Sequence, residues 1–163
     1  MLNNKTFLAV ILARGKSKRL PRKNILDLSD KPLIAWSIEA GLKSKYIDKL
    51  VVSSDDEEIL EISNKFGSDT LKRPDKLAGD TSTSLDAIKH SITIFERYDY
   101  VMLLQPTSPL RNDKHIDEAI ELLEQKNADA VISVCETSYS PLWCNTLDDN
   151  LSMTSFLRDE VLN

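Results

Sequence analysis

The feature of this sequence that most constrains its fold is the continuous apolar run that ends at Leu12. The segment Thr6–Leu12 shows no alternation of apolar and polar side chains, so a strand formed there is buried on both faces. Such strands lie inside parallel sheets, whose two faces are covered by helices. The strand leads into a segment that we call the basic loop, residues 13–24. Positions 14–23 hold six cations and no acid, although the formal net charge of the whole chain is -5.

The rest of the chain alternates short β-type runs with helix-type segments. Further strands are predicted at Leu50–Ser53, Thr70–Lys72, Tyr100–Leu104 and Ala130–Val134, and helices at about residues 32–43, 59–66, 85–95 and 116–123. This alternation predicts an α/β fold, a doubly wound, mostly parallel sheet with helices on both faces. The length of 163 residues fits a single domain, 1–163.

Composition narrows the class of protein. No apolar run approaches the roughly 20 residues of a membrane span, and no signal peptide follows the first methionine, so we expect a cytoplasmic protein without a membrane partner. Cys135 and Cys144 fit no metal-site spacing, and Cys135 is predicted to be a small buried thiol. The acidic balance of the chain argues against a nucleic acid as partner.

The basic loop is predicted to hold a polyphosphate. In open α/β sheets, ligands bind beyond the carboxyl ends of the strands, and this loop adds cations and the hydroxyl of Ser17 at that edge. A solvated basic turn or a nucleic-acid patch is the alternative. The loop matches neither the P-loop nor the dinucleotide fingerprint. This leaves a class that grips triphosphate with side-chain cations, such as the nucleotidyltransferases.

Two further loops are predicted to open on the same edge of the sheet. Residues 73–84 form a long run rich in small hydroxyl residues, and residues 105–111 form a turn fixed by two prolines. The alternative is that these loops only cap helices, with cap candidates from Asp80 to Ser84 and at Ser108. Asp55 and Asp56 are predicted to cap a helix too, although they could instead face a ribose or a metal.

Three motifs also carry a resemblance to a known family. They are Leu12-Ala13-Arg14-Gly15-x-Ser17-Lys18-Arg19-x-Pro21-x-Lys23-Asn24, then Arg73-Pro74 with Leu77-Ala78-x-Asp80-Thr81 and Ser84, and finally Gln105-Pro106-Thr107-Ser108-Pro109-Leu110-Arg111. In this order and spacing the motifs resemble those of the acylneuraminate cytidylyltransferases, the CMP-N-acetylneuraminic acid synthetases. The resemblance covers nearly the whole chain. It implies a nucleotide-diphospho-sugar transferase-like fold and transfer of CMP from CTP to the anomeric hydroxyl of a nine-carbon α-keto acid, with release of pyrophosphate.

The resemblance also implies roles for individual residues. Arg14 and Lys23 would be catalytic, and Gln105 would contact the acceptor sugar. The implied nucleotide-binding residues are Ala13, Arg14, Ser17, Lys23, Asn24, Arg73, Ser82 and Ser84. Among these, Arg14, Ser17, Lys23 and Asn24 would hold the triphosphate, and Arg73, Ser82, Ser84 and the backbone around Ala13 would lie near cytosine and ribose.

The implied partners are CTP and a nonulosonic acid sugar, with a homodimer in the full-length form and Mg²⁺ as cofactor. The chain ends before the family's Asn-Gly-Ala-Ile-Tyr dimerisation segment and its distal aspartates, so the metal ligands are expected mainly beyond residue 163 and the domain is predicted to be truncated. The acceptor stays open between N-acetylneuraminate, legionaminate and pseudaminate. A CMP-Kdo synthetase is a further alternative, for which an acidic residue is expected in the third motif. The chain could also be a nucleotide-binding fragment without turnover.

Overall fold

The computed structural model describes residues 2–17, 19–79 and 82–140, together with residues 144, 149–150 and 153. The chain divides into two compact units, residues 1–131 and 132–163. Every helix and strand that the structure describes lies in the first unit. The expectation of one domain over the whole length therefore stays a prediction.

The first unit is built on a four-stranded parallel sheet with the strand order β5-β4-β1-β6. The strands are β1 (Phe7–Leu12), β4 (Ile47–Ser54), β5 (Asp69–Lys72) and β6 (Tyr100–Leu103). The central strand β1 pairs on one side with β4 and on the other with β6, and Val10 lies opposite both Val51 and Leu103. The predicted doubly wound, mostly parallel sheet is confirmed.

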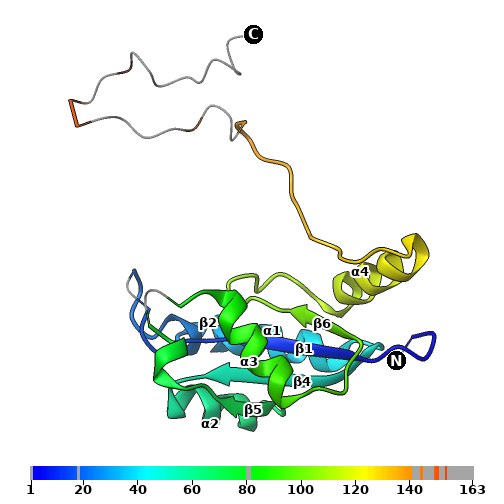
Figure 1. Ribbon diagram of the computed structural model, residues 1–163. Coiled ribbons are helices and arrows are strands. Elements are labelled where there is room, and N and C mark those ends of the chain that lie inside the picture. Colours follow the sequence, from blue (N-terminus) through cyan, green and yellow to red (C-terminus); the bar gives the residue numbers. More distant parts are fainter. Residues whose placement is uncertain are drawn as a thin grey trace. The chain divides into compact units, whose positions relative to one another are not determined.

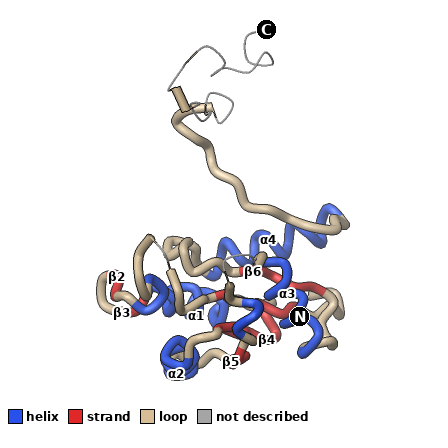
Figure 2. The backbone as a smooth tube through the Cα atoms, turned by 60° about the vertical axis from the view of Figure 1, so that its left-hand side comes forward, coloured by secondary structure: helices blue, strands red, loops and turns tan. Residues whose placement is uncertain are grey.

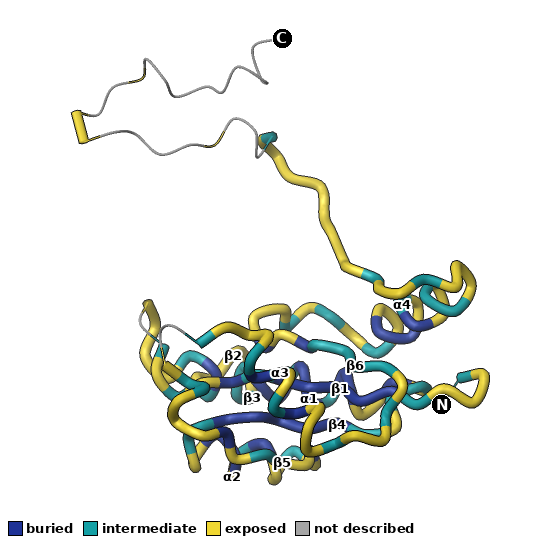
Figure 3. Tube along the Cα trace, in the orientation of Figure 1, coloured by how far each residue is buried: buried dark blue, intermediate teal, exposed yellow. Residues whose placement is uncertain are grey.

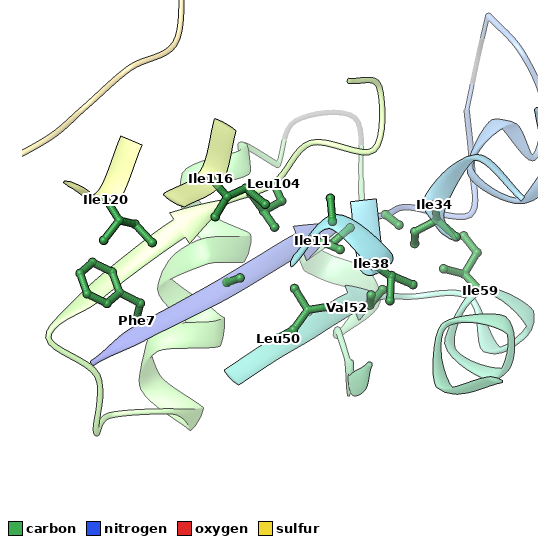
Figure 4. Close-up of a cluster of buried hydrophobic side chains, with 13 residues drawn as sticks. Phe7, Ile11, Ile34, Ile38, Leu50, Val52, Ile59, Leu104, Ile116 and Ile120 are labelled. Atoms are coloured by element: carbon green, nitrogen blue, oxygen red, sulfur yellow. The ribbon is translucent and has the colours of Figure 1, made fainter. Parts of the chain in front are cut away.

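Helices cover both faces of this sheet (Figures 1 and 2). They are α1 (Leu33–Lys43), α2 (Glu57–Lys65), α3 (Ser84–Ile94) and α4 (Asp113–Lys126). On one face, Phe7, Ala9 and Ile11 of β1 pack against buried residues of α1, α2 and α4 (Figure 4). On the other face, Leu8 and Val10 pack with partly buried side chains that include Phe95, at the end of α3.

The burial of β1 explains its sequence. Leu8, Ala9, Val10 and Ile11 all have no exposed surface, because alternate side chains enter the two different cores. Figure 3 shows β1 and the second half of β4 as the buried centre of the unit. A hairpin of β2 (Asp27–Leu28) and β3 (Lys31–Pro32) was not predicted, since strands of two residues are too short to show a period.

The helix ends follow the capping signals of the sequence. The side chain of Asp56 accepts from the backbone N–H of Ile59 at the start of α2, and Gly67 follows that helix with a φ of 91°. Thr83 caps α3 in a reciprocal capping box, so one of the cap candidates from Asp80 to Ser84 is confirmed. Helix α4 is capped by Asn112, and the cap considered at Ser108 is wrong.

The predicted fifth strand, Ala130–Val134, is wrong for this structure. The described residues include no strand there, and the side chains of Ile132 and Val134 are 82% and 90% exposed. An apolar run becomes a strand only when a neighbouring strand pairs with its backbone, and the described residues offer this segment none. Cys135 is exposed rather than buried for the same reason.

Of the helices that the structure describes, none combines the length and the apolar character that crossing a bilayer requires. Most of the segment after Ser140 lies outside the described residues. The expectation of Mg²⁺ ligands mainly beyond residue 163 stays a prediction.

Candidate functional site

A cavity of about 610 Å³ opens where the predicted loops meet, at the carboxyl ends of the strands. Its wall comes from the basic loop after β1, the loop after β5, the start of α3 and the turn after β6. Among the predicted site residues, those that line the cavity are Arg14, Ser17, Lys23, Asn24, Arg73, Ser82, Ser84 and Gln105. Residues from three separate stretches of sequence, 14–24, 73–84 and 105, are therefore brought together, while their individual roles stay predictions.

Ala13 is the predicted site residue that does not line the cavity. Its side chain is fully buried in the core below the basic loop, and its backbone N–H donates to the carbonyl of Ser53 at 3.1 Å. This bond continues the pairing of β1 with β4 by one residue. Ala13 thus fixes the point at which the loop leaves the sheet.

The basic loop is held by a hydrogen bond between its two ends and by ion pairs with residues at the start of α2. Within the loop, the buried side-chain amide of Asn24 donates to the carbonyl of Arg14 at 3.1 Å. Arg22 forms ion pairs with Glu58 in the first turn of α2 and, at 3.7 Å, with Asp56, the N-cap of that helix. Arg22 is thus directed to α2, while its neighbour Lys23 lines the cavity. Lys18 lies outside the described residues.

Arg73 is the most buried cation of the cavity wall, with 4% of its surface exposed. Its backbone N–H donates to Ser54 at 2.7 Å, and its guanidinium lies 3.5 Å from the carboxylate of Asp55. Burial lowers the pKa of Arg73, the carboxylate of Asp55 opposes this shift, and the positive charge of Arg14 adds to it. Arg14 and Arg73 are therefore close enough to repel each other, and an anion between them would relieve that repulsion.

The charged side chains in the described cavity wall are all positive. Arg14, Arg19, Lys23 and Arg73 line it, and no carboxylate appears among the described lining residues. Arg19 was not among the predicted site residues, although it belongs to the same run of cations. A concave site that several cations line, with no carboxylate among its described lining residues, favours an anionic ligand, and several cations suit a polyphosphate.

The loop after β5 adds hydroxyl groups to this wall. The hydroxyl of Ser82 donates to the carbonyl of Lys76 at 2.8 Å, which ties the loop across its width. Thr83 and Ser84 line the cavity at the start of α3, where backbone N–H groups face away from the helix. Helix capping and cavity lining thus come from the same residues. Asp80 and Thr81 lie outside the described residues.

Gln105 lies in the turn after β6, and its backbone carbonyl is held by the side chains of Ser37 and Arg111. The buried hydroxyl of Ser37 on α1 donates to the backbone carbonyl of Gln105 at 3.3 Å. The guanidinium of Arg111 donates to the same hydroxyl at 2.8 Å and to the same carbonyl at 3.4 Å. Burial lowers the pKa of Arg111. The exposed side chain of Gln105 is left facing the cavity, beside Thr107.

The described residues do not by themselves fit a Mg²⁺ site. Mg²⁺ prefers oxygen ligands and usually needs carboxylates, and the described wall supplies cations, hydroxyls and amides. Across the described residues, no group of three or more His, Cys, Asp or Glu side chains is placed to hold a metal ion. Asp55 and Asp56 are engaged with protein donors, so their alternative reading as metal ligands gains no support.

Comparison with known proteins agrees with the motifs. A family model described as "Cytidylyltransferase" matches residues 8–153. The N-acylneuraminate cytidylyltransferase of Escherichia coli O18:K1:H7 is 40% identical over 150 residues, which is 91% of this chain and 36% of that protein. A pseudaminic acid cytidylyltransferase of Campylobacter jejuni is 41% identical over 137 residues, 81% of this chain and 59% of that protein. The chain thus spans between about a third and three fifths of these relatives.

Among solved structures, the fold is similar to that of a CMP:2-keto-3-deoxy-manno-octonic acid synthetase complexed with CTP. The TM-score is 0.68 at 22% identity, and the match covers 76% of this chain and 49% of the other. At this identity the likeness concerns the fold alone. It agrees with the parallel sheet of the first unit.

Proposed function

This chain belongs to the cytidylyltransferase family, and from that premise we propose that it binds CTP and transfers CMP to the anomeric hydroxyl of a sialic acid-type nine-carbon α-keto acid. The observation that carries the proposal is the convergence of the family-like residues of three motifs on one cavity with four cations in its wall. A basic turn that was only solvated would not line a cavity together with residues of two other loops, as the basic loop does here. The acidic character of the chain speaks against nucleic acid as the occupant.

The chemistry asks for position and charge compensation. The sugar hydroxyl oxygen bonds to the α-phosphorus, the bond from that phosphorus to the bridging oxygen breaks, pyrophosphate leaves and the hydroxyl proton passes to solvent. Negative charge builds up on the leaving group, and preorganised cations stabilise it. We assign this task to Arg14 and Lys23, with Ser17 and Asn24 beside them. Arg73, Ser82 and Ser84 would contact the nucleoside, and Gln105 the acceptor.

Mg²⁺ belongs to the proposal as a cofactor of the whole protein. When bound, such an ion would add charge compensation on the triphosphate. The homodimer likewise remains part of the proposal for the whole protein. The identity of the acceptor is kept at the level of the class, because relatives of equal similarity are named for neuraminate and for pseudaminate.

The nucleotide part of the proposal is tested by calorimetric titration of the chain with CTP, UTP, ATP and GTP. We expect CTP to bind most tightly. Equal affinity for the four nucleotides would remove base specificity and leave a generic phosphate grip.

The transfer reaction is tested by pyrophosphate release from CTP with N-acetylneuraminate, legionaminate, pseudaminate and Kdo. The assay compares this chain with the chain extended by its natural downstream sequence. We expect turnover in the extended protein and little or none in the chain of 163 residues. CTP binding without turnover in either form would favour the alternative of a nucleotide-binding module.

A further inference from the structure

We propose that Asp55 is a positioning residue of the cavity, whose carboxylate fixes both the backbone of the basic loop and the guanidinium of Arg73. This inference rests on the proposed function, because it concerns the same cavity. Asp55 does not line the cavity itself. It acts through two groups that lie next to it.

The contacts of Asp55 differ from those expected of a helix cap. Asp56, its neighbour, supplies the cap of α2. The carboxylate of Asp55 instead accepts from the backbone N–H of Gly15 at 3.1 Å, forty residues earlier in the chain. The same oxygen, Oδ1, lies 3.5 Å from the guanidinium of Arg73. One carboxylate oxygen therefore joins the loop after β1 to the loop after β5.

Asp55 is itself held firmly enough to act as an anchor. Its side chain is 14% exposed, and its backbone carbonyl accepts from the ammonium group of Lys72 at 2.7 Å. The next residue, Asp56, donates its backbone N–H to the buried hydroxyl of Ser54 at 3.0 Å. The carboxylate thus lies directly after the end of β4, where hydrogen bonds hold the backbone.

The charge of Asp55 is placed where it helps an anion to bind. Arg73 is buried beside another cation, Arg14, and needs a nearby negative charge to stay in that position. A carboxylate inside the cavity would compete with the phosphates for these cations. Because Asp55 lies behind the wall, it can balance Arg73 without occupying the place of the ligand.

Glycine at position 15 fits this arrangement. A Cβ atom built on Gly15 would lie 2.6 Å from Oδ2 of Asp56 and 2.8 Å from its Cβ. The backbone of the loop can therefore approach the end of β4, and reach the carboxylate of Asp55, only without a side chain at this position.

The test uses trypsin, which cleaves after the basic residues of the loop, with fragments identified by mass spectrometry. We compare the wild type with Asp55→Ala, Asp55→Asn and Asp48→Ala in the absence of nucleotide. Asp48 is the matched control, because its carboxylate accepts from the N–H of Phe7 at the opposite end of β1. Asp55→Ala is expected to raise the rate of loop cleavage about fivefold, the fold-change of one lost hydrogen bond. Asp55→Asn keeps an acceptor oxygen and is expected to restore most of the protection.

The proposal is overturned if Asp55→Ala leaves loop cleavage unchanged, or if Asp48→Ala raises it equally. Should Asp55→Ala fail to fold, amide hydrogen exchange in the wild type decides. The N–H of Gly15 should then exchange more slowly than those of Lys16 and Arg19 in the same loop, and equal rates would overturn the proposal.

Titration of the same variants with CTP tests the link to binding, and weaker binding by Asp55→Ala than by Asp48→Ala is expected. If the wild type binds no CTP, the proposed function fails, whereas the cleavage and exchange results still decide the role of Asp55.

Discussion

Lys23 and Arg22 are adjacent cations of the basic loop, and their neutralisation should have very different consequences. Lys23 lines the cavity. Arg22 is turned to α2, where it pairs with Glu58 and Asp56, and its side chain is 47% exposed. We therefore compare Lys23→Gln with Arg22→Gln, two variants that remove one positive charge each from the same loop and keep a polar side chain.

The expected magnitudes follow from these surroundings. A cation that meets charge developing on the leaving pyrophosphate is worth about 3 kcal/mol, so Lys23→Gln should lower kcat/KM roughly 150-fold. Partly exposed surface ion pairs are worth about 0.2–1 kcal/mol. Arg22→Gln should therefore lower stability by that amount and change kcat/KM by no more than about fivefold.

The assay is steady-state pyrophosphate release from CTP and the acceptor sugar, in the protein with its natural downstream sequence. Thermal unfolding of both variants serves as the control for stability. Losses of kcat/KM that are similar in the two variants would show that the loop contributes a diffuse positive field. A larger loss in Arg22→Gln would refute the assignment of Lys23 to the phosphates.

Three further predictions follow from contacts around the cavity and the sheet. Thr83→Ala removes the cap of α3 and should lower the free energy of unfolding by about 1 kcal/mol, seen as a lower urea midpoint at constant slope; an unchanged midpoint would contradict it. Gly15→Ala places a Cβ 2.6 Å from Oδ2 and 2.8 Å from Cβ of Asp56, so the basic loop must shift and CTP binding measured by calorimetry should weaken. Unchanged affinity would contradict this prediction. Hydrogen bonds from the backbone and hydroxyl of Thr6 hold the pKa of Asp99 below its usual value of 3.8. This contribution to stability is complete above pH 3.8 and is lost as the pH falls through the folded pKa, so Asp99→Asn should flatten the acid end of the stability curve, and a parallel curve would disprove it.

The fold was predictable because the continuous apolar sequence of β1 indicates a strand that is buried on both faces. A run without alternation requires cover on both faces, and the periodic segments between the strands supply that cover. The same reasoning gave a wrong strand at Ala130–Val134. Four of its five residues are apolar, but a strand also needs a paired neighbour, and pairing is a property of the assembled sheet.

The candidate site was predictable as a set of loops and not as a set of contacts. The motifs indicated which residues gather at the edge of the sheet, and most of them line one cavity. The sequence could not separate Asp55 from Asp56, two identical side chains at successive positions. Only the packed structure shows that one caps α2 and that the other reaches Gly15. The third motif includes Arg111, but its contact with Ser37 was not predicted, because Ser37 lies far away in the chain.

The strand order of the sheet has a consequence for the time course of folding. Its central strand β1 pairs with β6, and the paired residues lie more than ninety positions apart in the chain, as with Phe7 and Tyr100. Contacts so distant in sequence close large loops and form slowly. Residues at the carboxyl ends of both β1 and β6 line the cavity. A chain in which these two strands have not yet paired therefore lacks the complete binding wall. A ligand that recognises only the completed wall stabilises the native state by mass action, and its binding during refolding would report when β1 and β6 have paired.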